Sequence, residues 1–112
     1  MSFCKKSGIK CRRRQKGIKL TPLAQEDMES IYLYGLLNFG EEAAERYLSK
    51  LENTFSTIAQ YRVGTERHEI GRGIYSLPVS SHVIFFLYEV DTVIIVRILH
   101  QSQDAVRHLR WI

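Results

Sequence analysis

The chain has 112 residues, of which 45% are hydrophobic and 25% charged, a composition typical of one soluble globular domain. Its longest apolar runs are far shorter than the roughly 20 residues that a membrane-spanning helix needs. No apolar segment follows the basic start, so the layout of a secretory signal peptide is missing. We therefore expect a cytoplasmic protein that does not contact a membrane.

The net charge of +4 is distributed unevenly along the chain. Residues 1–19 contain eight of the sixteen basic residues and no acidic residue, so residues 20–112 carry eight bases against twelve acids. We interpret residues 1–17 as a flexible basic leader and residues 18–112 as the folded domain. Basic tails also contact nucleic acids, but a solvated tail is the simpler interpretation.

The two cysteines, Cys4 and Cys11, both lie in this leader. They lack the further ligands of a zinc site, and a disulfide is not expected in a reducing cytoplasm. No phosphate-binding loop and no metal-ligand spacing occurs elsewhere in the sequence. We expect neither a metal nor a cofactor.

The domain is predicted to begin with a short strand and a helix. Residues 18–21 alternate between apolar and polar side chains, as strands do. Thr21 followed by Pro22 is a typical helix start, because Thr caps free amides and Pro suits the first helical position. We place Glu26 and Asp27 in the first turn, where the helix dipole favours acids.

A second helix is predicted directly after the first, which Gly40 is expected to end. The next apolar residues recur at helical spacing, with charged residues on the opposite side: Ala44, Tyr47, Leu48, Leu51, Phe55 and Ile58. The short connection implies an antiparallel helical hairpin.

Three strand-like runs follow a glycine-rich segment, and they span Ile74–Val79, Val83–Val90 and Thr92–Leu99. Residues 100–112 are of mixed character and are compatible with a short C-terminal helix. The order β-α-α-β-β-β predicts a two-layer α+β domain, in which an N-terminal strand and a three-stranded antiparallel sheet pack against the helical hairpin.

The last two strands carry apolar side chains on both faces. Two helices cover only one face of a sheet, so the other face is expected to need a partner unless the leader or the C-terminal segment covers it.

Polar side chains gather at the end of the last strand. Arg97 is suited to a two-pronged phosphate contact and His100 to proton transfer near neutral pH, so together they are suited to act on RNA. Asp104 is close enough in sequence to pair with either side chain. A purely structural cluster is the competing interpretation.

The ordered set of segments resembles the ParE/RelE superfamily of bacterial toxins, and the ParE branch most closely, over about residues 18–109. The resemblance rests on IKLTPLAQEDMESIYLYGLLNFGEEAAERYLSKLENTF, HEIGRGIYSLPVSSHVIFF and IIVRILHQSQD. Its most specific parts are Ala24-x-x-Asp27, the Phe39-Gly40 turn, the strand Ser76–Val79, and Arg97-Ile98-Leu99-His100 followed by Asp104.

The resemblance implies a toxin of a type II toxin–antitoxin system, of the kind linked to plasmid stabilisation. A cognate antitoxin neutralises such toxins by folding onto them. The expected assemblies are a homodimer of the toxin or a heterotetramer with the antitoxin. ParE-like members act on DNA gyrase and block replication, whereas RelE-like members cleave mRNA on the ribosome. We expect a gyrase poison that acts by binding. The alternatives are a ribosome-dependent mRNA endonuclease using Arg97 and His100, and a non-toxic interaction module of the same fold.

Two sets of site residues follow from this interpretation. The target-binding candidates are Arg72, Tyr75, Arg97, His100 and Asp104. The antitoxin-binding candidates, on the sheet face expected to be uncovered, are Phe85, Phe86, Ile95 and Val96. The sequence departs from the resembled pattern at Tyr75, where ParE-like chains often have Arg, and at Gln101, where the ribonuclease branch often has an aromatic residue. The second departure disfavours the ribonuclease alternative.

Overall fold

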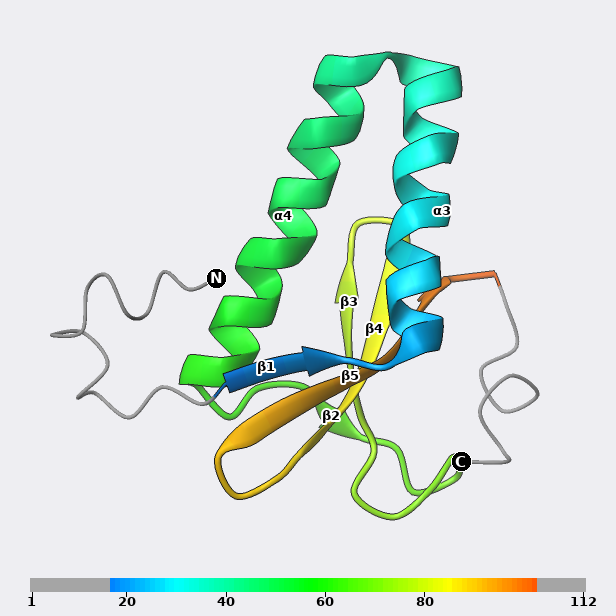
Figure 1. Cartoon of the computed structure of the whole chain (residues 1–112). Coiled ribbons are helices and arrows are strands. Elements are labelled where there is room, and N and C mark those ends of the chain that lie inside the picture. Colours follow the sequence, from blue (N-terminus) through cyan, green and yellow to red (C-terminus); the bar gives the residue numbers. More distant parts are fainter. Residues whose placement is uncertain (1–16, 103–112) are drawn as a thin grey trace, which may run out of the picture.

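The computed structural model describes residues 17–102, so most of the predicted leader, the predicted C-terminal helix and Asp104 lie outside the described part of the chain. The elements are β1 (Gly17–Leu20), α3 (Pro22–Phe39), α4 (Glu41–Gln60), β2 (Thr65–Glu66), β3 (Tyr75–Val79), β4 (His82–Tyr88) and β5 (Thr92–His100). Figure 1 shows the two helices as a hairpin that rises beyond one end of the sheet. The predicted α+β class and order of elements are confirmed.

The sheet has five strands in the order β1-β5-β4-β3-β2. β1 pairs parallel with β5, and the other neighbours are antiparallel. The short strand β2 was not predicted, because it contributes only two residues from the polar segment before β3. The parallel pairing brings the N-terminal strand beside the C-terminal one, and this fixes where α3 starts.

The start of α3 follows the predicted chemistry. Thr21 Oγ1 accepts a hydrogen bond of 3.1 Å from the Ala24 amide and donates one of 2.8 Å to the Val96 carbonyl, while Pro22 begins the helix. The cap thus also anchors α3 to β5. The predicted position of Glu26 and Asp27 is wrong, because the first turn holds no acidic residue and both lie one turn further along. Asp27 has another role, described below.

The turn between the helices depends on small residues. Gly40 has a φ of 99°, and its amide donates to the Gly35 carbonyl. A Cβ on Gly35 would lie 3.3 Å from the Ala44 Cβ, so glycine at this position lets α3 and α4 approach closely.

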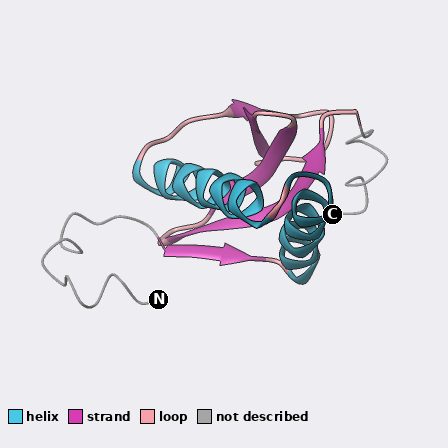
Figure 2. Cartoon of the chain, turned by 90° about the horizontal axis from the view of Figure 1, so that it is seen from above, coloured by secondary structure: helices cyan, strands magenta, loops and turns pink. Residues whose placement is uncertain are grey.

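The main core lies between the hairpin and one face of the sheet, and Figure 2 views this arrangement from above. Its largest fully buried side chains come from α4 and from β4 and β5: Leu51, Ile58, Ile84, Phe86, Val93 and Ile95.

The opposite sheet face carries a second, smaller core. Phe85, Val96 and Leu99 are buried there, and Ile70 and Ile74 from the segment before β3 pack against them. The expectation of an uncovered sheet face at these positions is therefore wrong. The chain covers it itself, with Ile70 of the glycine-rich segment and with Ile74, which was predicted to begin a strand but lies just before β3.

Candidate functional site

A β-bulge in β5 determines where the polar side chains at the end of this strand point. Ile95 pairs with Phe86 and Arg97 with Phe85, so Val96 is an extra residue without a partner on β4. Ile95 and Ile98 therefore both enter the helix-side core although they are three residues apart. Bulges shift the alternation of side chains in this way, and here the shift places Ile98, rather than Arg97, in the helix-side core.

Arg97 forms a two-pronged ion pair with Asp27 of α3. Arg97 Nε and Nη2 donate to the two Asp27 carboxylate oxygens at 2.8 and 3.0 Å, and the Ile98 amide donates to Asp27 Oδ2 at 2.9 Å. The two side chains are only 15% and 14% exposed. The hydrogen bond with Asp27 raises the pKa of Arg97 above its usual range, although burial opposes the effect. The pair holds α3 against the bulged strand.

The spacing Ala24-x-x-Asp27 now has a physical explanation. Residues three apart share one side of a helix. Ala24 is completely buried against the sheet, where a small side chain lets α3 come close, and Asp27 then reaches the bulge. The spacing is one of the marks of the family resemblance, but the pairing of Asp27 with Arg97 was not predicted from the sequence.

Two histidines face each other at the end of β4 and β5. The rings of His82 and His100 meet edge to face, with centroids 5.4 Å apart. His82 Nδ1 lies 2.7 Å from the hydroxyl of Tyr47 on α4, within hydrogen-bonding distance. Burial lowers the pKa of His82, and the charge of His100 adds to this effect while Asp27 opposes it. Tyr47 and His82 were not among the predicted site residues, because only the fold brings α4 to this strand end.

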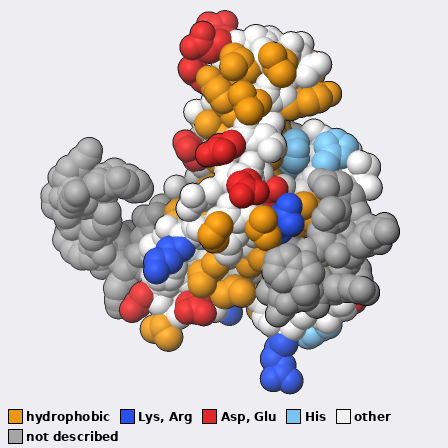
Figure 3. Space-filling view, turned by 45° about the vertical axis from the view of Figure 1, so that its right-hand side comes forward, with side chains coloured by type: hydrophobic (Ala, Val, Ile, Leu, Met, Phe, Trp, Pro, Cys, Tyr) orange, Lys and Arg blue, Asp and Glu red, His pale blue; other side chains and the backbone are white. Residues whose placement is uncertain are grey.

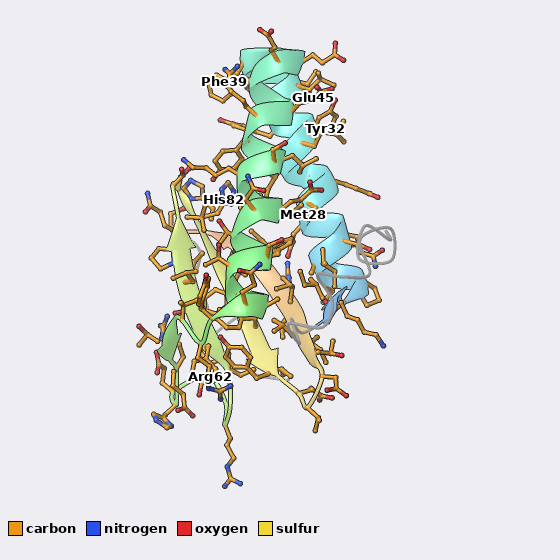
Figure 4. All side chains as sticks on the ribbon, turned by 90° about the vertical axis from the view of Figure 1, so that its left-hand side faces the viewer. Met28, Tyr32, Phe39, Glu45, Arg62 and His82 are labelled. Atoms are coloured by element: carbon orange, nitrogen blue, oxygen red, sulfur yellow. The ribbon has the colours of Figure 1, made fainter. Side chains whose placement is uncertain are left out.

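A groove of about 900 Å³ separates the hairpin from this end of the sheet. Tyr34 and Phe39 of α3 line one wall, and His82, Ile98 and His100 line the other. In Figure 4, Phe39 and His82 lie on the same side of the hairpin. We call this space the sheet-side groove.

The hairpin also exposes large apolar side chains beside this groove. Tyr34, Leu37 and Phe39 are 63%, 83% and 69% exposed. Figure 3 shows hydrophobic side chains gathered on the upper part of the hairpin, with acidic side chains next to them and the histidines below. This is the largest departure from the sequence prediction, which placed the exposed apolar surface on the sheet.

The predicted target-binding residues do not form one surface. Arg72 is exposed in the segment before β3, and Tyr75 stacks on Phe86 with ring centroids 5.9 Å apart. Tyr75 pairs with Phe86 of β4 and His100 pairs with His82 of the same strand. Their levels along β4 therefore differ by four residues, which corresponds to about 13 Å. Arg97 pairs with Phe85, so along β4 it lies one residue from the level of Tyr75 and three residues from that of His100. The predicted residues are therefore spread over the sheet and do not form one cluster.

All four predicted antitoxin-binding residues are buried. Phe86 and Ile95 belong to the helix-side core, and Phe85 and Val96 to the smaller core on the other face. The premise that these side chains are exposed is wrong.

Within residues 17–102, no group of three or more His, Cys, Asp or Glu side chains is arranged to hold a metal ion. No helix in the same part of the chain is long and apolar enough to cross a membrane.

Comparison with known proteins gives consistent results. The family model described as ParE toxin of type II toxin–antitoxin system, parDE, matches residues 18–105. Toxin ParE1 of Mycobacterium tuberculosis is 34% identical over 92 residues, covering 80% of this chain and 94% of the relative.

Solved structures share the fold at 20% sequence identity. A chromosomal ParDE toxin–antitoxin system from P. aeruginosa matches with a TM-score of 0.67, covering 78% of this chain and 97% of the other. The toxin–antitoxin complex RelBE2 from Mycobacterium tuberculosis matches with a TM-score of 0.58, covering 80% and 94%. Because the family model spans most of the chain and the M. tuberculosis relative is similar over nearly its full length, this chain belongs to the ParE toxin family of type II toxin–antitoxin systems.

Proposed function

We propose that this toxin binds DNA gyrase and thereby blocks replication, and that it acts by binding rather than by a catalytic centre of its own. Gyrase is the target that the resemblance to ParE-like toxins implies. The Asp27–Arg97 ion pair is the observation that supports action by binding. Arg97 is the side chain that a nuclease would use to hold phosphate, and its Nε and Nη2 already donate to Asp27.

The mRNA endonuclease alternative requires Arg97 and His100 to meet one phosphodiester. His100 is exposed at the end of β5, but two of the three guanidinium nitrogens of Arg97, Nε and Nη2, already donate to Asp27. A phosphate that took the Nε–Nη2 edge would have to break this largely buried, two-pronged pair, which is costly because the charge of Asp27 would stay behind unpaired. The geometry therefore disfavours the endonuclease alternative.

A supercoiling assay tests the target. Purified toxin is incubated with DNA gyrase, relaxed plasmid and ATP, and both supercoiling and double-strand breaks are measured. We expect supercoiling to fall and breaks to accumulate only when gyrase is present. Codon-positioned mRNA cleavage in a translation extract, with gyrase unaffected, would replace this proposal with the nuclease alternative. Harmless expression of a folded chain that leaves both systems unaffected would support the non-toxic module.

We further propose that the cognate antitoxin docks along the sheet-side groove and the apolar hairpin residues beside it. The structural neighbours are toxin–antitoxin systems, which supports an antitoxin partner for this chain. A soluble monomer rarely leaves contiguous large apolar side chains in water, and such patches usually mark a contact. Tyr34 and Phe39 line the groove of about 900 Å³, and the exposed Leu37 follows Tyr34 by three residues, and so by almost one helical turn, on α3.

The matched variants Leu37→Lys and Val90→Lys test this docking surface. Both residues are apolar and more than 80% exposed, at 83% and 86%, but Val90 lies in the turn between β4 and β5, away from the groove. Affinity is measured against the product of a neighbouring antitoxin gene. Leu37→Lys should weaken binding about tenfold or more, and Val90→Lys should leave it unchanged. Equal affinity for both variants would place the antitoxin elsewhere.

A further inference from the structure

A second groove, of about 600 Å³, runs along the hairpin on the side away from His82. We call it the outer groove. Its floor is apolar, with Met28 and Tyr32 of α3 and Leu48 of α4, and Leu20 at the end of β1 closes one end. In Figure 4, Met28 and Tyr32 lie on one side of the hairpin and Phe39 and His82 on the other, so the two grooves are separate.

The walls of the outer groove are acidic. Glu29 of α3 and Glu52 of α4 line it, and no Lys or Arg does so. Neither carboxylate has an ion-pair partner among residues 17–102. The helices around it are also acidic, because α3 and α4 together contain seven acidic residues and only two basic ones. The groove therefore suits a basic segment that carries some apolar side chains.

The chain itself contains such a segment. Residues 1–16 hold seven Lys and Arg and no acid, together with the apolar residues Phe3 and Ile9. The family model match begins only at residue 18, so this segment is additional to the shared fold. It joins β1 at Gly17, three residues before Leu20, which lines the groove.

The length of the segment is sufficient to follow the groove. Sixteen extended residues span up to about 50 Å. The part of α3 between Gln25 and Leu33, which borders the groove, measures roughly 12 Å at 1.5 Å per residue. The covalent link at Gly17 also gives the segment a high effective concentration at this surface.

We propose that residues 1–16 dock in cis in the outer groove, with their basic side chains against Glu29 and Glu52 and their apolar side chains on its floor. The contact is largely between exposed charges. Raising the salt from about 0.1 M to about 1 M shortens the Debye length from ~10 Å to ~3 Å, so high salt should release the segment.

Paramagnetic NMR of the full chain tests this proposal, since the only two cysteines are Cys4 and Cys11. A nitroxide is attached to Cys4 in a Cys11→Ser background, and the broadening of each backbone amide is measured. We expect broadening at groove residues such as Glu29 and Leu48 at low salt, and its loss at high salt. Broadening spread evenly over the surface, or none at low salt, would overturn the proposal.

Charge-neutralising variants test whether residues 1–16 bind at the outer groove or are attracted to acidic side chains anywhere on the surface. Glu29→Gln with Glu52→Gln should reduce the ratio of docked to free segment about fourfold, at about twofold for each exposed pair. The matched pair Glu66→Gln with Glu69→Gln, around β2 at the opposite edge of the sheet, should leave it unchanged. An equal effect of both pairs would refute docking at the groove.

A mixing experiment distinguishes other occupants. Spin-labelled chain without ¹⁵N is mixed with ¹⁵N-labelled chain that carries no spin label. Groove broadening of the same size in this mixture would show that the segment reaches a second copy, and would overturn docking in cis. Adding short duplex DNA at low salt should leave the broadening in the labelled chain unchanged. Its complete loss would identify nucleic acid as the preferred partner of residues 1–16 and would likewise overturn the proposal.

Discussion

The Asp27–Arg97 ion pair provides the most direct test of how this fold is held together. Replacing Asp27 with Asn keeps the shape but leaves the Arg97 guanidinium, whose side chain is only 15% exposed, without its counter-charge. Breaking a buried pair in this way usually costs about 3–5 kcal/mol. Because both groups here keep some contact with solvent, we expect a loss of about 3 kcal/mol in the free energy of unfolding, at the lower end of that range.

A double-mutant cycle measures the interaction itself. Unfolding by urea is followed for Asp27→Asn, for Arg97→Met and for the two combined. Each single variant should lose about 3 kcal/mol, whereas the combined variant should lose little more than one of them, because the buried charge and its partner are then removed together. The Arg67–Glu69 pair, with side chains 31% and 51% exposed, is the control and should show a coupling below about 1 kcal/mol.

The same variants decide whether Arg97 also contacts the target. If the role of Arg97 is structural, the combined variant folds and retains its effect on gyrase or on growth. A folded but inactive combined variant would show that Arg97 acts on the target directly. A coupling energy as small as that of the surface control would refute the conclusion that the pair fastens α3 to β5.

Three further outcomes are expected. Gly64→Ala should destabilise the fold by roughly 2–4 kcal/mol, because Gly64 has a φ of 97° and its new Cβ would lie 2.8 Å from Phe86 Cζ. Gly40→Ala should cost only the backbone strain of about 1–3 kcal/mol, since nothing lies within 4 Å of its Cβ position, and urea unfolding that ranks the two in the opposite order would contradict this. The free energy of unfolding should fall as the pH drops below the ordinary histidine pKa of 6.5, because burial lowers the pKa of His82 and the unfolded chain then binds the proton more readily. His82→Gln should flatten this pH profile, and an unchanged profile in that variant would contradict the assignment to His82.

The local elements could be predicted because their causes lie within a few residues. Thr21, Pro22 and Gly40 mark helix ends by their own hydrogen bonding and backbone preferences, and the structure places both ends of α3 there. The periodicity of α4 and the alternation in β4 and β5 likewise depend on the side chains of one segment. The order of elements and the α+β class follow from these local signals.

The site depended on contacts between residues far apart in sequence. Asp27 and Arg97 are 70 residues apart, and Tyr47 and His82 are 35 apart, so no local pattern relates them. The bulge at Val96 shifts the alternation of β5, and this single extra residue decides that Ile98 joins Ile95 in the helix-side core. The covering of the second sheet face by Ile70 and Ile74 was hidden for the same reason, because nothing in the segment around them shows that it folds back over β4 and β5.

The sequence by itself therefore determined the family, the order of helices and strands, and the uneven distribution of charge between residues 1–19 and the rest of the chain. Only the tertiary structure decided which apolar side chains stay exposed. Exposure depends on what the rest of the chain covers, and α3 carries apolar residues on more sides than the sheet and α4 can cover. That surplus moves the expected partner surface from the sheet to the hairpin. There we propose the sheet-side groove for an antitoxin and the outer groove for residues 1–16.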